Sequence, residues 1–233
     1  ENALQPISLI HMNTVLIENE LKNIFEKYRF IPNVEIELRL GWYCVDHFDT
    51  NIGKQFYNTI LEQLSLFDET CKSVSNTEVY VDNFNRIVYD TNKQRVVSSH
   101  KKIKLHTTDI KLFGTPYDLR ISVSVEKPTK YSKELNLEHI KKIRSRKRNR
   151  FSYKMWHYDL TQIESEDTHK LTDSCQAYEF ELEFNPILCD KRVTNLFLAK
   201  SALMKLMDIV TLNKNEKIEL KNSLIHTYKY KRI

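Results

Sequence analysis

The chain has 233 residues, and its 36 Lys and Arg against 31 Asp and Glu give a formal net charge of +5. This length suits one domain with a sizeable buried core, and no apolar run approaches the ~20 residues that a transmembrane helix needs. With only three glycines, the sequence excludes the glycine-rich loops that hold phosphates in many nucleotide-binding proteins. Any phosphate that this protein handles must therefore be held by side chains.

The four cysteines are far apart and form no C-x-x-C pair: Cys44, Cys71, Cys175 and Cys189. This spacing favours free thiols over a disulfide framework or a zinc site, which predicts a reducing, intracellular compartment. Because the sequence begins with Glu1 rather than Met, we expect it to be part of a longer chain.

The N-terminal half of the sequence predicts two helices and three strands. Apolar residues recur at spacings of three and four over residues 14–30 and 52–67, which indicates amphipathic helices with one buried face. Between them, residues 34–40 alternate polar and apolar side chains with the period of a strand. The same alternation predicts strands over residues 86–89 and 101–107.

The C-terminal half continues this pattern. Further strands are expected over residues 118–126, 147–154, 157–163 and 178–184. We also expect a short helix over residues 129–145 and an amphipathic helix over residues 193–210. Many short strands with short connections favour an antiparallel, largely closed sheet flanked by helices, in a single domain of residues 1–233.

Alternate side chains of a strand point to opposite faces, so each predicted strand divides into two sets. Two strands place a mainly acidic set opposite an apolar set: Glu35, Glu37 and Arg39, and Glu179, Glu181 and Glu183. Other strands place polar, mostly basic residues on one face: Lys102, Lys104, His106, Arg120, Glu126, Arg146, Arg148, Arg150, Asp159 and Thr161. The charges are therefore sorted by strand.

A single strand of this kind is most simply interpreted as part of a sheet whose charged face lies in water. Two features favour a charged face that is turned inward instead. Solvated faces usually mix both signs of charge, whereas most of these strands carry mainly one sign. The three amphipathic helices also need an apolar sheet face on which to pack. We therefore expect a barrel with a charged interior and helices outside.

Clustered carboxylates inside a barrel need a compensating charge. Two like charges about 4 Å apart repel by about 4 kcal/mol at an effective dielectric constant near 20. Carboxylate oxygens are hard ligands that suit Mg²⁺ or Mn²⁺, so we expect a divalent cation at the acidic strands. The basic strands match the spread oxygens of a triphosphate, and phosphoryl transfer requires such charge neutralisation. The sequence therefore predicts hydrolysis of a terminal phosphate.

Three segments resemble the triphosphate tunnel metalloenzymes: residues 34–41 (VEIELRLG), residues 178–184 (YEFELEF) and residues 148–163, which contain Asp159-Leu160-Thr161. Within this family, the resemblance is to the RNA 5′-triphosphatases of mRNA capping in fungi, protozoa and large DNA viruses. The basic strands and a composition rich in Lys, Asn and Ile are similar to capping enzymes of the mimivirus type.

The resemblance implies an α+β protein built on an eight-stranded antiparallel tunnel that hydrolyses the γ-phosphate of 5′-triphosphate RNA. It implies metal ligation by Glu35, Glu37 and Glu183, with Glu179 and Glu181 supporting the metal or its waters. Glu126 would orient or deprotonate the attacking water, and Asp159 would orient a wall arginine. The phosphate-binding walls would consist of Arg86, Lys102, Lys104, Arg120, Arg146, Arg148, Arg150 and Thr161.

The resemblance also implies a cofactor, partners and a location. The cofactor would be Mg²⁺ or Mn²⁺, and the substrates would be 5′-triphosphate RNA and nucleoside triphosphates. Guanylyltransferase and methyltransferase domains would follow in the same polypeptide, and no membrane partner is expected. The location would be a virion or a cytoplasmic viral factory.

Several residues leave alternatives open. His157 stands where the family has a basic residue, and Arg39 extends the first motif to E-x-E-x-R, similar to enzymes that act on tripolyphosphate or thiamine triphosphate. Lys141, Lys142 and Arg144 precede the expected strand 147–154, so they are expected in solvent or against RNA phosphates. The alternatives are therefore a small-molecule triphosphatase of the same fold and a non-enzymatic basic RNA-binding module.

Overall fold

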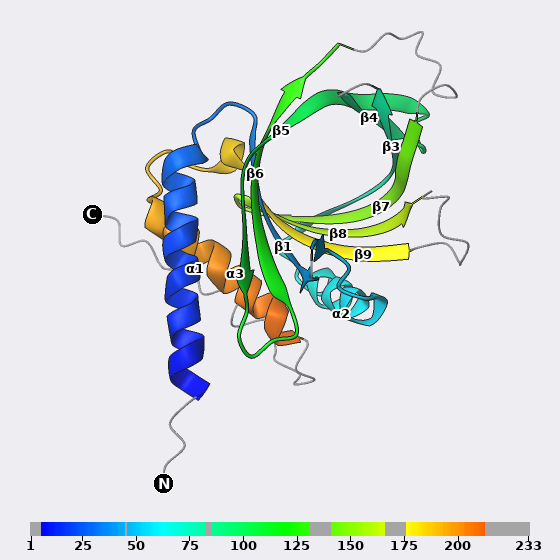
Figure 1. The fold of residues 1–233 in the computed structure, drawn as a ribbon. Coiled ribbons are helices and arrows are strands. Elements are labelled where there is room, and N and C mark those ends of the chain that lie inside the picture. The colour runs from blue at the N-terminus through cyan, green and yellow to red at the C-terminus, as the bar shows by residue number, and fades with distance from the viewer. Residues whose placement is uncertain (1–5, 45, 83–84, 131–140, 166–175, 213–233) are drawn as a thin grey trace.

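The computed structural model describes residues 6–44, 46–82, 85–130, 141–165 and 176–212. Its strands close into a barrel, and the helices lie outside that barrel (Figure 1). The elements are, in chain order, α1 (Pro6–Tyr28), β1 (Val34–Tyr43), β2 (Phe48–Asp49), α2 (Lys54–Ser65), β3 (Cys71–Asp82), β4 (Asn85–Asp90), β5 (Arg95–Lys111), β6 (Asp118–Pro128), β7 (Lys141–Tyr153), β8 (Trp156–Ser165), β9 (Gln176–Phe184), the 3₁₀-helix η2 (Pro186–Leu188) and α3 (Asn195–Thr211).

The strand order around the sheet is β2-β1-β6-β5-β4-β3-β7-β8-β9, and an additional pairing between β1 and β9 closes it. The two-residue strand β2 only extends the pairing of β1, so eight strands form the wall of the barrel. The pairings of these strands are antiparallel. The expected eight-stranded antiparallel barrel is therefore confirmed.

The hydrophobic core lies between the outer face of the barrel and the helices. On β1, the alternating residues Leu38 and Leu40 are fully buried on this outer face. Phe25 of α1 packs edge-on against Trp156 and Phe184, with ring centroids 6.2 and 5.2 Å away. Because the apolar halves of β1, β6, β7, β8 and β9 pack in the core with the helices, the charged halves of these strands are turned into the barrel.

The other two helices pack on different parts of the same outer face. Phe56 of α2 stacks on Tyr117, with ring centroids 4.9 Å apart. Ser201 of α3 accepts a hydrogen bond of 3.1 Å from the indole nitrogen of Trp156. Within the described ranges, no helix is both long enough and apolar enough to cross a bilayer.

The three amphipathic helices and the seven predicted strands are present, with different ends. One difference concerns β7, which begins at Lys141 rather than at residue 147. The helix expected over residues 129–145 is therefore wrong for residues 141–145, and residues 131–140 lie outside the described part of the chain. The two-residue alternation of arginines simply begins earlier than expected, and it keeps this segment extended.

The strand β3 has no counterpart in the sequence prediction. Its sequence is mostly polar, with Val74 exposed and Val79 buried, so it lacks a regular apolar period. A register shift between Val79 and Tyr80 interrupts its pairing with β7. Pairing with β4 and β7, rather than its own pattern, determines that this segment is a strand.

A second register shift places His106 on the opposite face of its strand from the one expected. In β5, the pairing with β6 shifts between Lys104 and His106. The extra residue of a bulge reverses the alternation of the side chains that follow it. His106 therefore does not share the charged face of Lys102 and Lys104, and its ring stacks on Tyr28 of α1 with centroids 6.0 Å apart.

Candidate active site

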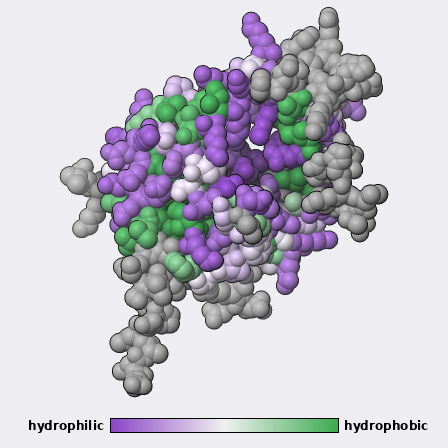
Figure 2. Space-filling model, in the orientation of Figure 1, coloured by the Kyte–Doolittle hydropathy of each residue, from purple (hydrophilic) through white to green (hydrophobic). Residues whose placement is uncertain are grey.

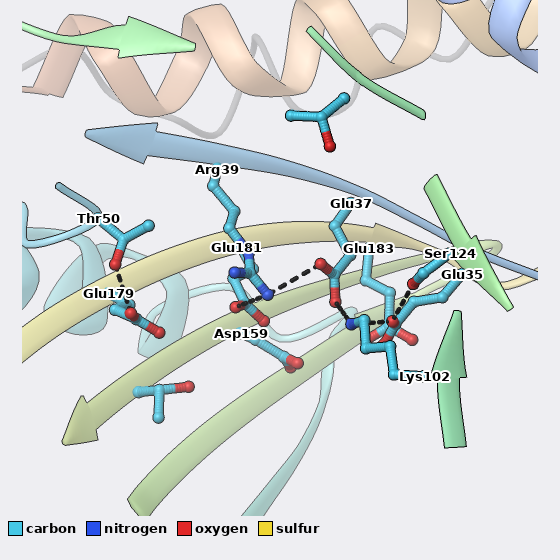
Figure 3. A network of polar contacts seen from close by, with 12 residues as sticks. Glu35, Glu37, Arg39, Thr50, Lys102, Ser124, Asp159, Glu179, Glu181 and Glu183 are labelled. Atoms are coloured by element: carbon cyan, nitrogen blue, oxygen red, sulfur yellow. Dashed lines mark hydrogen bonds and ion pairs between the residues drawn. The ribbon is translucent and has the colours of Figure 1, made fainter. Parts of the chain in front are cut away.

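The two acidic strands, β1 and β9, lie side by side in the barrel wall. Their antiparallel register pairs Glu37 with Glu183 and Arg39 with Glu181. Residues paired in register share a face, so these carboxylates form one surface inside the barrel (Figure 3). Glu37 is 4% exposed and Glu181 is 2% exposed. Barrel closure thus brings together two carboxylate motifs that are far apart in the sequence.

Two cations bridge these carboxylates across strands (Figure 3). The ammonium of Lys102 on β5 contacts Glu35, and it lies 3.4 Å from Oε1 of Glu37. Nη2 of Arg39 lies 2.8 Å from Oε2 of Glu37 and 2.8 Å from Oε1 of Glu181. Arg39 and Lys102 are therefore integral parts of the acidic surface.

Asp159 of β8 is fully buried and holds two arginines of β7. Arg150 donates two hydrogen bonds to the carboxylate of Asp159, at 2.7 and 2.6 Å. Arg148 donates to Asp159 at 2.7 Å, to the hydroxyl of Thr161 at 2.9 Å and to Glu181 at 3.1 Å. Such charge-assisted, bidentate hydrogen bonds fix the direction of a guanidinium. Asp159 thus has the orienting position that the resemblance implies.

The protonation of the carboxyls depends on burial and on their neighbours. Burial, opposed by Arg39 and reinforced by neighbouring carboxylates, raises the pKa of Glu37 to about 8. Burial also raises the pKa of Glu183 to about 7, against the charge of Arg150. At Glu181, burial is outweighed by Arg39 and further cations, which lower the pKa to about 2. The protein's own cations thus leave part of the acidic charge uncompensated.

The charged side chains line two adjoining chambers of the barrel interior. The acidic chamber has about 270 Å³ and is lined by the carboxylates of β1 and β9 together with the arginines of β7. The hydroxyl chamber has about 470 Å³ and includes Thr107, Ser122 and Ser124 in its lining. Both chambers share Glu37 and Lys102 as lining residues. Figure 2 shows a hydrophilic recess in the middle of the molecular face, at the place where Figure 1 looks into the barrel.

The basic wall of the acidic chamber continues beyond Arg148. Burial, then the charges of neighbouring arginines, lowers the pKa of Arg146 to about 10, and burial also lowers the pKa of Arg144. The Nε atoms of Arg144 and Arg146 are buried without a hydrogen-bond partner among the described residues. Buried guanidinium groups in this condition favour an anion that accepts their hydrogen bonds. This wall therefore suits a polyanion.

The structure places most of the predicted site residues in the two chambers. The acidic chamber is lined by Glu35, Glu37, Arg86, Lys102, Glu126, Arg146, Arg148, Arg150, Glu181 and Glu183. Lys104 and Arg120 line the hydroxyl chamber. Asp159 and Thr161 lie behind the arginines that they hold. Glu179 is separate, because it lines neither chamber and accepts a hydrogen bond from Thr50.

Three ionisable lining residues were missing from the predicted site. Arg144, expected in solvent or against RNA, lines both chambers because β7 begins at Lys141 and the arginine alternation includes it. Arg39 was visible as the end of the E-x-E-x-R motif, but its bridge to Glu181 depends on barrel closure. His100 shares the face of Lys102, so extending that predicted strand by one residue would have found it.

His157 lies away from both chambers. Its ring nitrogens contact the hydroxyl of Ser152 and the amide nitrogen of Asn185, each at 2.9 Å. Burial, together with the charge of Arg150, lowers the pKa of His157, which favours the neutral ring. His157 therefore has a structural role outside both chambers.

The acidic surface fits a divalent cation by its chemistry. In the described ranges, no three His, Cys, Asp or Glu side chains converge on one ion position as they stand. The carboxylate oxygens are instead directed to Lys102 and Arg39 (Figure 3). The ammonium held between Glu35 and Glu37 marks a position where these oxygens bind positive charge. An all-oxygen set suits a hard cation, which would replace Lys102 there.

Comparison with known proteins gives the family of the chain. A family model described as mRNA capping enzyme, beta chain, matches residues 50–215, which is more than half of the chain. The search of curated protein sequences found no match.

Solved structures of RNA triphosphatases share the fold. The Schizosaccharomyces pombe Pct1 RNA triphosphatase in complex with the Spt5 CTD superposes with a TM-score of 0.67 at 17% identity, covering 84% of this chain and 91% of that chain. The S. pombe Pct1 RNA triphosphatase alone has a TM-score of 0.65 at 17% identity, with the same coverage of 84% and 91%. The Mimivirus capping enzyme triphosphatase has a TM-score of 0.54 at 14% identity, covering 83% of this chain and 96% of that chain.

A closed antiparallel barrel with carboxylates and arginines inside defines a triphosphate tunnel protein. The family model then places it more narrowly. The chain belongs to the family of the mRNA capping enzyme beta chain, and it is an RNA 5′-triphosphatase.

Proposed function

We propose that this RNA triphosphatase removes the γ-phosphate from 5′-triphosphate RNA ends in a reaction that depends on a divalent cation, and that it also hydrolyses nucleoside triphosphates. One observation carries the proposal: the carboxylates of β1 and β9 and the arginines of β7 line the same chamber inside the barrel. A triphosphate and a cation bring complementary charges to these two surfaces.

In this proposal, Glu35, Glu37 and Glu183 hold the cation, Mg²⁺ or Mn²⁺, on the acidic surface. Glu181 supports its waters, while Glu179 is held by Thr50 outside the chambers. A bound divalent cation would neutralise the charge on the phosphate oxygens and hold them in place.

Arg146, Arg148 and Arg150 of β7 bind the terminal phosphate beside the acidic surface, where Arg148 and Arg150 contact Glu181 and Glu183. Asp159 keeps Arg148 and Arg150 directed into the chamber. Lys104 and Arg120 lie in the hydroxyl chamber, where they suit the remaining phosphates, and Asp109 orients Arg120 with hydrogen bonds of 2.7 and 2.8 Å.

Glu126 accepts a proton from the attacking water at the edge of the acidic chamber. The oxygen of this water forms a bond to the γ-phosphorus while the bond to the β–γ bridging oxygen breaks. The bridging oxygen keeps the electron pair and stays on the RNA. The products are inorganic phosphate and a 5′-diphosphate RNA end.

The test is phosphate release with Mg²⁺ or Mn²⁺ from triphosphate-ended RNA, ATP, tripolyphosphate and thiamine triphosphate. We expect release from RNA and ATP, with little from the two small molecules. Arg150→Ala should reduce release from both RNA and ATP, because it contacts the phosphate common to both. Lys147→Ala is the matched control, since Lys147 is an exposed basic residue of the same strand.

A second function has one supporting observation. Arg39 bridges Glu37 and Glu181 inside the barrel, which gives the E-x-E-x-R motif a place in the site. Preference for tripolyphosphate or thiamine triphosphate over RNA in the same assay would favour a small-molecule triphosphatase. RNA binding without any phosphate release would instead favour a non-enzymatic module.

We also propose guanylyltransferase and methyltransferase domains in the same polypeptide, in a virion or a cytoplasmic viral factory. The support is the resemblance to capping enzymes of large DNA viruses. An immunoblot of the native protein tests it, because a band near 27.8 kDa would contradict the longer chain.

A further inference from the structure

Glu126 has a histidine as its partner inside the acidic chamber. His100 on β5 lies diagonally across from Glu126 on β6, because Lys102 is the register partner of Glu126. Nε2 of His100 lies 3.1 Å from Oε1 of Glu126. The side chain of His100 is 12% exposed and that of Glu126 is 35% exposed. The carboxylate thus reaches both the histidine and the space of the chamber.

This partner distinguishes Glu126 from the other carboxylates of the acidic chamber. Glu35, Glu37, Glu181 and Glu183 each contact a Lys or Arg side chain. Among the contacts of the described residues, the partner of Glu126 is instead the ring of His100. An imidazole N–H donates a directional hydrogen bond that can fix one carboxylate oxygen. His100 is therefore suited to orient Glu126.

The other histidines near the barrel are unsuited to this role. Both ring nitrogens of His157 contact Ser152 and Asn185, and this ring lines neither chamber. His106 faces away from the interior and packs on α1. His100 also faces the same chamber as Arg86 of β4, which is its register partner.

We propose that His100 is the positioning residue for Glu126. Its Nε2–H donates to Oε1, which leaves Oε2 directed to the attacking water. The inference rests on the proposed function, in which Glu126 accepts the proton of that water. His100 itself touches neither the water nor the phosphate. It acts only through the direction of the Glu126 carboxylate.

The experiment measures kcat and KM for triphosphate-ended RNA with His100→Leu, His100→Gln and Glu126→Gln in the full chain. Leucine cannot donate a hydrogen bond, so we expect kcat to fall about 10- to 100-fold with KM unchanged, as for the loss of a hydrogen bond to a charged group. The amide of glutamine can donate, so His100→Gln should recover most of kcat. His106→Leu changes an outward histidine of the same strand and should leave kcat unchanged.

A double variant identifies how His100 acts. In the Glu126→Gln background, His100→Leu should reduce kcat no further, because a positioning residue has nothing left to position. Full kcat in His100→Leu, with Glu126→Gln inactive, would overturn the role of His100 and leave the proposed function standing. Equal losses in His100→Leu and His100→Gln would also overturn it. Full kcat in Glu126→Gln would overturn the role of Glu126 itself, and with it this inference.

Discussion

At the scale of single residues, the barrel interior holds opposite charges in direct contact. Glu37 lies between Arg39 and Lys102 and next to Glu181. The two cations leave its pKa raised to about 8, since burial remains the largest influence. Burial of such a carboxyl is costly in its charged form, which agrees with the binding role proposed for Glu37.

The substitution Glu37→Gln keeps the shape of the side chain and removes its charge. We expect divalent-dependent phosphate release to fall about 100-fold or more, because the cation loses one of its carboxylates. The melting temperature should be unchanged or slightly higher, since repulsion among buried carboxylates decreases. Phosphate-release kinetics and thermal unfolding measure the two effects. The matched control is Glu164→Gln, which changes an exposed carboxylate of β8.

At the scale of elements, each helix and strand depends on contacts that its own sequence only partly reveals. The alternation of Glu and Leu in β1 was enough to predict a strand and its two faces. The start of β7 was not predictable in the same way, because Lys141 and Lys142 carry no apolar period and the strand depends on pairing with β3. Strand ends are determined by partners, and partners are distant in sequence.

At the scale of elements, the close approach of β2 to the backbone of β1 can be tested. A Cβ atom added at Gly41 would lie 2.1 Å from the backbone oxygen of Asp49 and 2.5 Å from the ring of Phe48. Gly41→Ala should therefore separate β2 from β1 and lower the free energy of unfolding by about 1–3 kcal/mol. Chemical denaturation measures this value. Asn58→Ala, on the exposed side of α2, is the control, and an equal effect of both would contradict the steric argument.

The packing of α3 on the barrel predicts a dependence on pH. Burial, reinforced by Lys154 and opposed by Asp208, lowers the pKa of Lys205 to about 8. The unfolded chain keeps the Lys205 proton up to a higher pH, so stability from this group rises between about pH 8 and 10.5. Lys205→Met should raise the melting temperature at pH 7, by ~2–4 °C for each 1 kcal/mol gained. The difference in melting temperature between Lys205→Met and the unsubstituted protein should be smaller at pH 10.

Thermal unfolding of both proteins across this pH range measures the effect. Lys200→Met, in the same helix, provides the comparison. An advantage of Lys205→Met that stays constant from pH 7 to pH 10 would show that Lys205 is charged in the folded protein throughout.

At the scale of the whole molecule, closure of the barrel has one stabilising and one destabilising consequence. Closure turns the apolar faces to the helices and places many charged groups in a confined interior. Some of these charges compensate one another, as in the contacts of Asp159 with Arg148 and Arg150. The remaining charge is available to bind ligands. A ligand that binds the folded barrel would therefore also stabilise it.

This linkage predicts that Mg²⁺ or Mn²⁺ raises the melting temperature. At a concentration 100 times the dissociation constant, a ligand stabilises the folded state by about 2.7 kcal/mol, which corresponds to a shift of roughly 5–10 °C for a chain of this size. EDTA should reverse the shift. The combined substitutions Glu37→Gln and Glu183→Gln should remove it, and an undiminished shift in that variant would mean that the cation binds elsewhere.

The sequence by itself determined the strand faces, the sorting of acidic and basic strands, and hence the polar interior with helices outside. These features depend on the periodicity of polar and apolar side chains, which is a local property of residues two to four positions apart. Only the tertiary structure decided which charges meet: Arg39 with Glu181, Lys102 with Glu35, and His100 with Glu126. The register shifts after Val79 and after Lys104 were also decided only by the tertiary structure. Each depends on the register between strands, which is established when the barrel closes and every strand has two neighbours.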